Sequence, residues 1–91
     1  MIITTGDLKG DYEIVDAIFA IDSHSGGFLS GVDPAKAFQG VKDQLSTNAK
    51  KLGCNAIIEC QFEYRNSLAD GFIGKKQAIE IFAYSTAVKT K

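Results

Sequence analysis

The feature that most constrains this chain is a single predicted helix among segments that otherwise have the pattern of strands. Asp33-Pro34 favours a helix start, because aspartate caps the first turn and proline is well suited to the first helical position. Gly53 fits the left-handed C-cap, and Gly40, which costs about 1 kcal/mol relative to alanine inside a helix, predicts a close approach there. Apolar side chains recur every three or four residues, as on one helical face: Phe38, Val41, Leu45, Ala49 and Leu52.

Three further segments have the composition and the alternation of strands. Residues 12–22 are rich in β-branched and aromatic side chains, and residues 55–65 alternate between apolar and polar. Residues 75–88 form a third strand after a polar loop at 66–74, and a short extended piece at 2–5 is expected to pair with the first strand or with a neighbour. The predicted order β-α-β-β places the chain in the α+β class, with a three-stranded, mainly antiparallel sheet packed on one helix.

Apolar side chains occupy both faces of the first and third predicted strands. The second strand places its apolar side chains on one face: Ala56, Ile58, Cys60, Phe62 and Tyr64. One helix covers only one face of a sheet, so the other face is expected to expose a patch made of Ile14, Ile18, Phe82, Tyr84 and Val88. Patches of this size are rare on monomers, and burying each such side chain is worth about 1.5–3 kcal/mol. The sequence therefore predicts a homo-oligomer.

Length and composition limit the classes of function. Ninety-one residues correspond to one domain, residues 1–91, and 45% hydrophobic with 23% charged residues is typical of a globular protein. A formal net charge of −1 gives no attraction to nucleic acid. No apolar run reaches the ~20 residues that span a membrane. The first residues lack the pattern of a secretion signal, so we expect a cytoplasmic protein with reduced cysteines.

Short pieces spread over nearly the whole chain resemble the YbjQ family in their order and spacing. They are Thr4-Thr5, Gly10 with Tyr12-Glu13-Ile14-Val15, Lys51-Leu52-Gly53-Cys54-Asn55-Ala56-Ile57-Ile58, and Ser85-Thr86-Ala87-Val88-Lys89. Heavy-metal binding is ascribed to that family, but its biochemical role is largely unassigned. The resemblance implies a single YbjQ-like domain with a dodecin-like subunit fold, a ring-shaped homo-oligomer that is most often a pentamer, and a divalent metal ion as ligand.

The chain departs from that family in one region. The family has a longer segment between the first strand and the helix, which is rich in arginine and glycine and is followed by Tyr-Glu. Here that segment is compressed to residues 22–32. No function that resides in the longer segment is therefore transferred to this chain.

Asp22, His24 and Cys54 are the candidate metal ligands. In an extended chain Asp22 and His24 lie on one face, about 6.5 Å apart, but a stable site needs three or four ligands. A neighbouring subunit or Asp33 would supply the others; a solvated loop histidine is the alternative interpretation of His24. Cys54, just after the helix cap, is expected to be accessible, whereas Cys60 is expected to be a buried hydrophobe. The two cysteines lie about 20 Å apart along a strand, too far to share one ion.

No catalytic constellation stands out in the sequence. No nucleophile has a plausible histidine partner, and residues 26–31 match no phosphate-binding motif. Glu59, Glu63 and Glu80 are more typical of a solvated sheet face than of paired catalytic carboxylates. The sequence favours a non-enzymatic binding or assembly protein whose partner is itself. Two alternatives stay open: a small-molecule carrier ring with ligand at the subunit interfaces, and a hydrolytic enzyme that uses His24.

Overall fold

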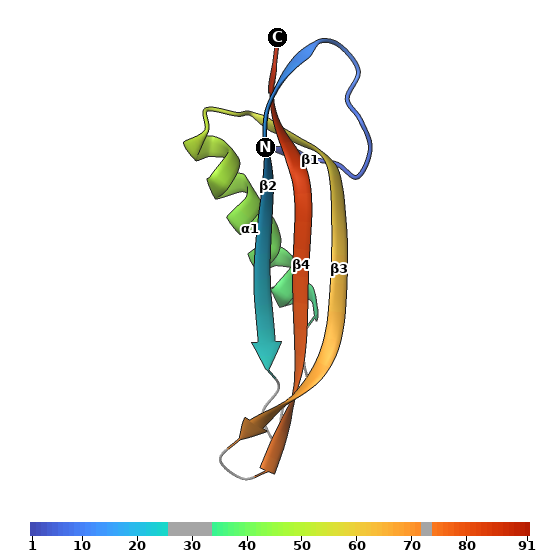
Figure 1. The fold of residues 1–91 in the computed structure, drawn as a ribbon, viewed down its shortest axis with the longest axis vertical. Helices are drawn as coiled ribbons and strands as arrows, with labels where there is room; N and C mark the ends of the chain where they lie inside the picture. The colour runs from blue at the N-terminus through green and yellow to red at the C-terminus, as the bar shows by residue number, and fades with distance from the viewer. Residues whose placement is uncertain (26–33, 72–73) are drawn as a thin grey trace.

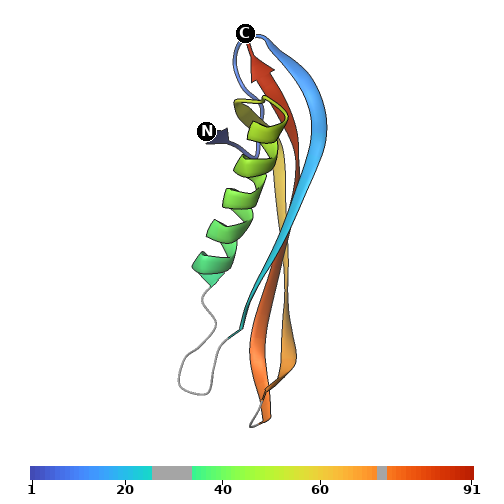
Figure 2. The same cartoon turned by 90° about the vertical axis from the view of Figure 1, so that its left-hand side faces the viewer.

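The computed structural model describes residues 1–25, 34–71 and 74–91, without the side chains of residues 24–25, 67–71 and 74–77. Within these residues, one helix lies across one face of a sheet and none lies on the opposite face (Figures 1 and 2). The elements in chain order are β1 (Ile2–Ile3), β2 (Tyr12–Ser25), α1 (Pro34–Lys51), β3 (Ala56–Gly71) and β4 (Gly74–Thr90). The predicted helix start at Asp33 lies outside the described residues.

The sheet has four strands in the order β1-β3-β4-β2. β1 pairs in parallel with β3, while β4 pairs antiparallel with both β3 and β2. The α+β class and the single helix are confirmed, but the sheet is mixed and four-stranded, because the short extended piece near the N-terminus adds β1 beside Ala56 and Ile57. The extended piece was expected to pair with a strand, and the structure shows that its partner is β3.

β3 and β4 form one long hairpin whose arms extend further than predicted. Their pairing continues from Ala56 opposite Val88 to Gly71 opposite Gly74. Residues 66–74, which were expected to be a loop, therefore belong mostly to the two strands. The loop was predicted from polar composition alone. Strand pairing depends also on the neighbouring strand, and here the backbone pairing of β3 with β4 continues through these polar residues. The result is an elongated molecule with extents of 53 × 22 × 17 Å.

The apolar stripe of α1 forms the core against the sheet. Val41, Leu45 and Ala49 are fully buried, and Phe38 packs edge-on against Phe62 with ring centroids 5.5 Å apart. The helix ends as predicted. Gly53 adopts a φ of 74°, the left-handed conformation in which a side chain is strained. Helix, cap and buried stripe are thus all confirmed, although Leu52 stays 38% exposed.

A β-bulge divides β3 into two parts with opposite facing. The register shifts between Ile58 and Gln61, and Glu59 has a φ of 52° there. A bulge adds one residue to one strand, so the residues that follow change faces. Cys60 lies in the core cluster under α1, whereas Ile58 belongs to a second buried cluster. The prediction of one continuous apolar face from Ala56 onward is therefore wrong.

Candidate functional site

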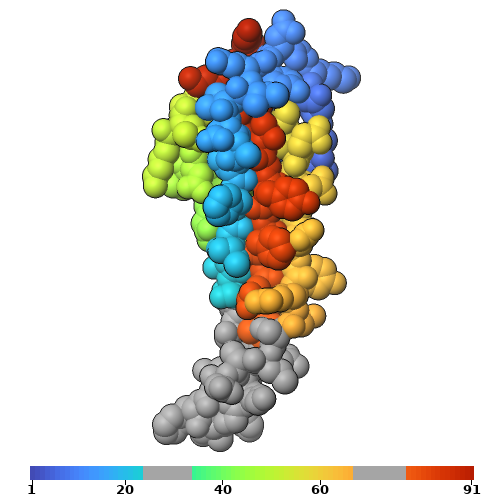
Figure 3. Space-filling view, in the orientation of Figure 1, coloured from blue at the N-terminus to red at the C-terminus, as the bar shows by residue number. Residues whose placement is uncertain are grey.

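The sheet face opposite α1 carries exposed apolar side chains, which we call the open-face cluster: Phe19 and Ile21 of β2, and Phe82 and Tyr84 of β4. Phe19 lies directly opposite Tyr84, and Ile21 lies directly opposite Phe82. Their exposed fractions are 77% for Phe19, 58% for Ile21, 37% for Phe82 and 50% for Tyr84. Figure 3 shows bulky side chains of β2 and β4 side by side on this face. Adjacent exposed side chains of this size are typical of an interaction surface.

The β2 residues on this face are not all those of the predicted patch. Ile14 is 65% exposed, as expected, but Ile18 is only 6% exposed and lies beneath α1. The register shifts between Ile14 and Asp16, so the face assignment changes at this bulge. Phe19 rather than Ile18 therefore projects from the open face. The sequence shows no signal for the bulge, because both alternations along β2 are apolar.

The N-terminal segment covers one end of the open face, beside the C-terminal end of β4. Leu8 and Tyr12 pack against the buried Val88 and Ile58. The Tyr12 hydroxyl donates a 2.6 Å hydrogen bond to Asp7 Oδ1. This bond lowers the pKa of Asp7 and raises the pKa of Tyr12. Val88, which was predicted to be exposed, is fully buried because this segment folds over it.

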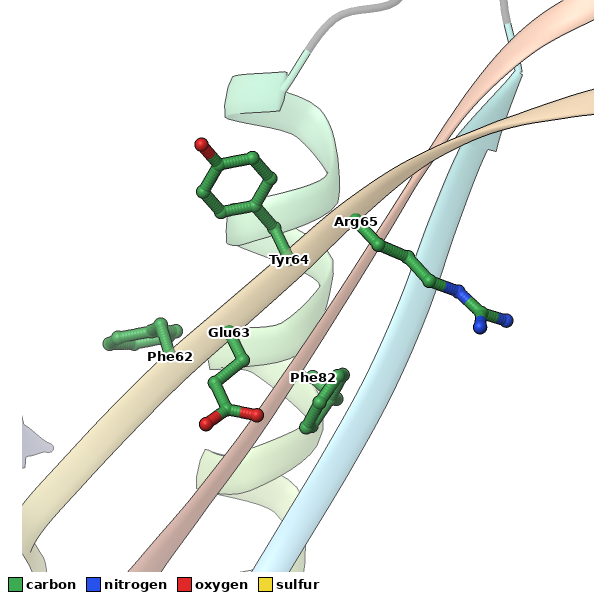
Figure 4. Close-up of a pocket in the computed structure, with 5 residues that line it drawn as sticks. All are labelled: Phe62, Glu63, Tyr64, Arg65 and Phe82. Carbon is green, nitrogen blue, oxygen red and sulfur yellow. The ribbon is translucent and has the colours of Figure 1, made fainter.

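A shallow, open hollow of about 600 Å³ lies along β3. Five side chains line it (Figure 4): Phe62, Glu63, Tyr64, Arg65 and Phe82. Phe62 and Tyr64 project from one side of β3, and Glu63 and Arg65 project from the other. The Arg65 guanidinium lies 2.9 Å from the Glu80 carboxylate of β4. This hollow was not predicted, because it depends on which strand lies at the edge of the sheet.

The first candidate metal ligands, Asp22 and His24, occupy alternate positions of β2. Asp22 is opposite Ile81 and His24 is opposite Ile79; the side chain of His24 lies outside the described residues. The Asp22 carboxylate accepts a 3.0 Å hydrogen bond from the Ser23 N–H. It also occupies the space that a Cβ atom at Gly40 would need. The close approach predicted for Gly40 is therefore confirmed, and its partner is Asp22.

The two cysteines are both free and buried. Cys54 is only 5% exposed, so the expectation that it is accessible is wrong, because it packs into the core cluster at the end of α1. Cys60 is fully buried, as predicted. Burial raises the pKa of the Cys60 thiol, and the Ser85 hydroxyl offsets part of this rise. Since the thiolate is the form that binds metal, Cys60 is poorly suited to the role.

The described residues of one subunit do not fit a heavy-metal site. Cys54 lies at the level of Val88 in the sheet, because the N–H of the adjacent Asn55 donates to the Val88 carbonyl. His24 lies opposite Ile79, nine residues away along β4, which is about 30 Å at ~3.3 Å per residue. No three His, Cys, Asp or Glu side chains in the described part of the chain form a group that could hold a metal ion. The candidate ligands thus remain apart within one subunit.

Taken together, the fold and this surface define a small α+β domain with one covered and one open sheet face. The chain belongs to the YbjQ family, described as "Putative heavy-metal-binding", whose model matches residues 14–91. No curated protein matches the chain. Within the described residues, no helical stretch combines the length and hydrophobicity that a bilayer crossing requires.

A solved structure of a protein of unknown function has the same fold. It belongs to the DUF74 family, comes from Pediococcus pentosaceus and aligns with a TM-score of 0.72. The two chains are 23% identical, and the alignment covers 100% of this chain and 98% of that one. At this identity the likeness establishes the fold and leaves the function to be argued from the surface.

Proposed function

We propose that the protein is a non-enzymatic assembly protein, a dodecin-like subunit that binds copies of itself through the open-face cluster and closes into a ring. The observation that carries this proposal is the direct pairing of Phe19 with Tyr84 and of Ile21 with Phe82 on a face that no helix covers. A contact between two different surfaces of the subunit forms a ring when the rotation closes. The family resemblance favours five subunits.

The size of the cluster supports association on energetic grounds. Burying each large apolar side chain is worth about 1.5–3 kcal/mol, and four such side chains are available on every subunit. Association costs about 4–15 kcal/mol in lost translational and rotational freedom. The gain and the cost are of the same order, so the cluster is large enough to decide whether subunits associate.

Light scattering on a size-exclusion peak tests the assembly. We expect wild-type protein to have a mass several times the 9.8 kDa of one chain. Phe19→Ser should lower that mass, because the substitution removes an exposed ring at the centre of the contact. Leu52→Ser is the matched control, since Leu52 is also an exposed apolar residue but lies outside the cluster. A monomeric wild type, or a Phe19→Ser variant with unchanged mass, would contradict the proposal.

As a second candidate function we propose metal-ion binding at a site shared between subunits. The positions of Asp22 and His24 favour this function, because the two residues lie two positions apart on β2, opposite Ile81 and Ile79. Each subunit would supply part of the ligand set, which is incomplete within one chain. Imidazole and carboxylate together suit zinc and copper ions.

Titration of Zn²⁺ and Cu²⁺ tests this second candidate, together with elemental analysis of the purified protein. We expect stoichiometric binding that is lost in His24→Ala and weakened in Phe19→Ser, because the latter separates the subunits. Gln39→Ala, at an exposed position on the helix, serves as the control. Weak binding that His24→Ala leaves unchanged would argue against a metal function.

A further inference from the structure

The two outer edges of the sheet differ in the hydrogen-bond partners of their outward-facing backbone groups. At the β2 edge, side chains of α1 reach over the strand: Gln44 Nε2 donates to the Ile21 carbonyl at 2.8 Å, and Asn48 Nδ2 donates to the Phe19 carbonyl at 3.4 Å. At the β3 edge, β1 and the residues after it extend only as far as Cys60. Beyond Cys60, no described strand lies on the outer side of β3. A free strand edge is a template for pairing with another chain.

The backbone direction along this free edge follows from one hydrogen bond. The Cys60 N–H donates to the Thr4 carbonyl at 3.0 Å, on the side of β3 away from β4. Because backbone groups alternate in direction along a strand, Phe62, Tyr64 and Asn66 also direct their N–H and C=O groups outward. The edge therefore offers a regular set of donors and acceptors centred on Tyr64.

We propose that this edge is a strand-addition site, and that its occupant is the same edge of a second copy, paired antiparallel about a twofold axis at Tyr64. In that register Glu63 of each copy lies opposite Arg65 of the other. Opposite charges placed directly across a strand pair stabilise it, and like charges destabilise it. An axis at Glu63 would set two carboxylates face to face, and an axis at Arg65 would set two guanidinium groups face to face. Of these three registers, the charges favour the one with its axis at Tyr64.

The shape of the edge fits an added strand. The hollow is lined by side chains from both faces of β3, with Tyr64 on one side and Glu63 on the other, and by Phe82 of β4 (Figure 4). Tyr64 is 64% exposed, and the Arg65 side chain is 70% exposed despite its contact with Glu80. A guanidinium has five N–H donors, so Arg65 retains donors for a second carboxylate.

This contact is separate from the open-face cluster, which it neither uses nor requires. Where both contacts form, the twofold axis joins two rings back to back, and the assembly contains an even number of subunits. Where only the edge contact forms, the assembly is a dimer. The two contacts are therefore distinguishable by mass.

The experiment is light scattering on purified full-length variants. Tyr64→Pro removes the outward N–H while leaving the β4 side of the strand intact, since proline is tolerated on an edge strand. We expect wild type to have a mass that is an even multiple of 9.8 kDa, and Tyr64→Pro to have half of it. Phe19→Ser should instead yield dimers. Lys42→Glu, on the exposed face of α1, is the control and should match wild type.

Charge reversal supplies a second test that does not depend on proline. Glu63→Arg and Arg65→Glu should each halve the mass, because each sets like charges opposite one another. Mixing the two purified variants should restore the full mass, since an all-positive edge then meets an all-negative one. The proposal is overturned if wild type contains an odd number of subunits, or if the mixture stays at half mass. A co-purifying peptide or small molecule, with a mass that Tyr64→Pro leaves unchanged, would assign the edge to a different occupant.

Discussion

Neighbouring residues on the same strands meet opposite environments on the two faces of this sheet. Ile81 of β4 is fully buried under α1, whereas the adjacent Phe82 is 37% exposed on the other face. Ile21, which lies opposite Phe82, is 58% exposed. β2 and β4 carry apolar side chains on both faces, so composition does not distinguish the two faces of these strands. One face therefore forms the core of the domain, while the other leaves large apolar side chains exposed to solvent.

The largest expected effect comes from truncation on the covered face. Ile81→Ala should lower the free energy of unfolding by about 2–5 kcal/mol, because it removes buried methyl groups and leaves a cavity between the sheet and α1. Urea denaturation followed by circular dichroism measures this loss. A change below about 1 kcal/mol would mean that the covered face does not form the core of the subunit.

The matched truncation on the open face should act on association instead. Ile21→Ala removes the same atoms from an exposed side chain, so the free energy of unfolding of a dilute, dissociated subunit should change by less than about 0.5 kcal/mol. The assembly should weaken by about 1.5–3 kcal/mol for each contact, as expected for an apolar side chain that is buried on association. Sedimentation over a concentration series measures the shift. Equal losses of subunit stability in Ile21→Ala and Ile81→Ala would erase the distinction between the faces.

A smaller effect is expected at the edge of β2, where the covered face meets solvent. Gln44→Ala removes the 2.8 Å bond to the Ile21 carbonyl and should cost about 0.5–1.5 kcal/mol, the net value of a typical hydrogen bond. Asn48→Ala, which removes the longer 3.4 Å bond, should cost less. Thermal unfolding of both variants checks the order, and a larger loss for Asn48→Ala would show that the edge is not held by these bonds.

The smallest effect concerns the N-terminal segment over the open face. The Tyr12–Asp7 hydrogen bond lowers the pKa of Asp7 below 3.8 and raises the pKa of Tyr12 above 10.0. The stabilisation from Asp7 is thus present above its ordinary pKa and is lost as the pH falls through its lowered value. The stabilisation from Tyr12 is present below its ordinary pKa and is lost as the pH rises through its raised value.

Tyr12→Phe removes both contributions while it keeps the ring that packs against Val88. Wild type should therefore exceed the variant in stability between these two limits, and the two should converge in strong acid and in strong base. Unfolding midpoints measured from pH 2 to 11 test this behaviour. A stability difference between wild type and Tyr12→Phe that does not vary with pH would show that the difference does not come from this hydrogen bond.

Local patterns in the sequence were sufficient for the helix but not for the sheet. The stripe through Val41, Leu45 and Ala49 and the cap at Gly53 follow from spacing and residue type within a few positions, and the structure confirms them. The facing of Ile18 and of Ile58 was predicted wrongly, because each depends on a β-bulge that leaves no mark in an apolar strand. Cys54 was wrongly expected to be accessible. Its burial depends on packing at the end of α1 between residues that are far apart in the sequence.

The residue pattern was sufficient to predict one helix and two strands with apolar side chains on both faces, all within a single small domain. It also determined that apolar surface would remain after the helix had covered what it could. The place of that surface depends on the fold, since bulges and strand order set which side chains meet across β2 and β4. The fold also leaves the outer side of β3 at Tyr64 without a neighbouring strand among the described residues. Hydrophobic burial is non-directional, so composition fixes its amount, whereas backbone pairing fixes its place.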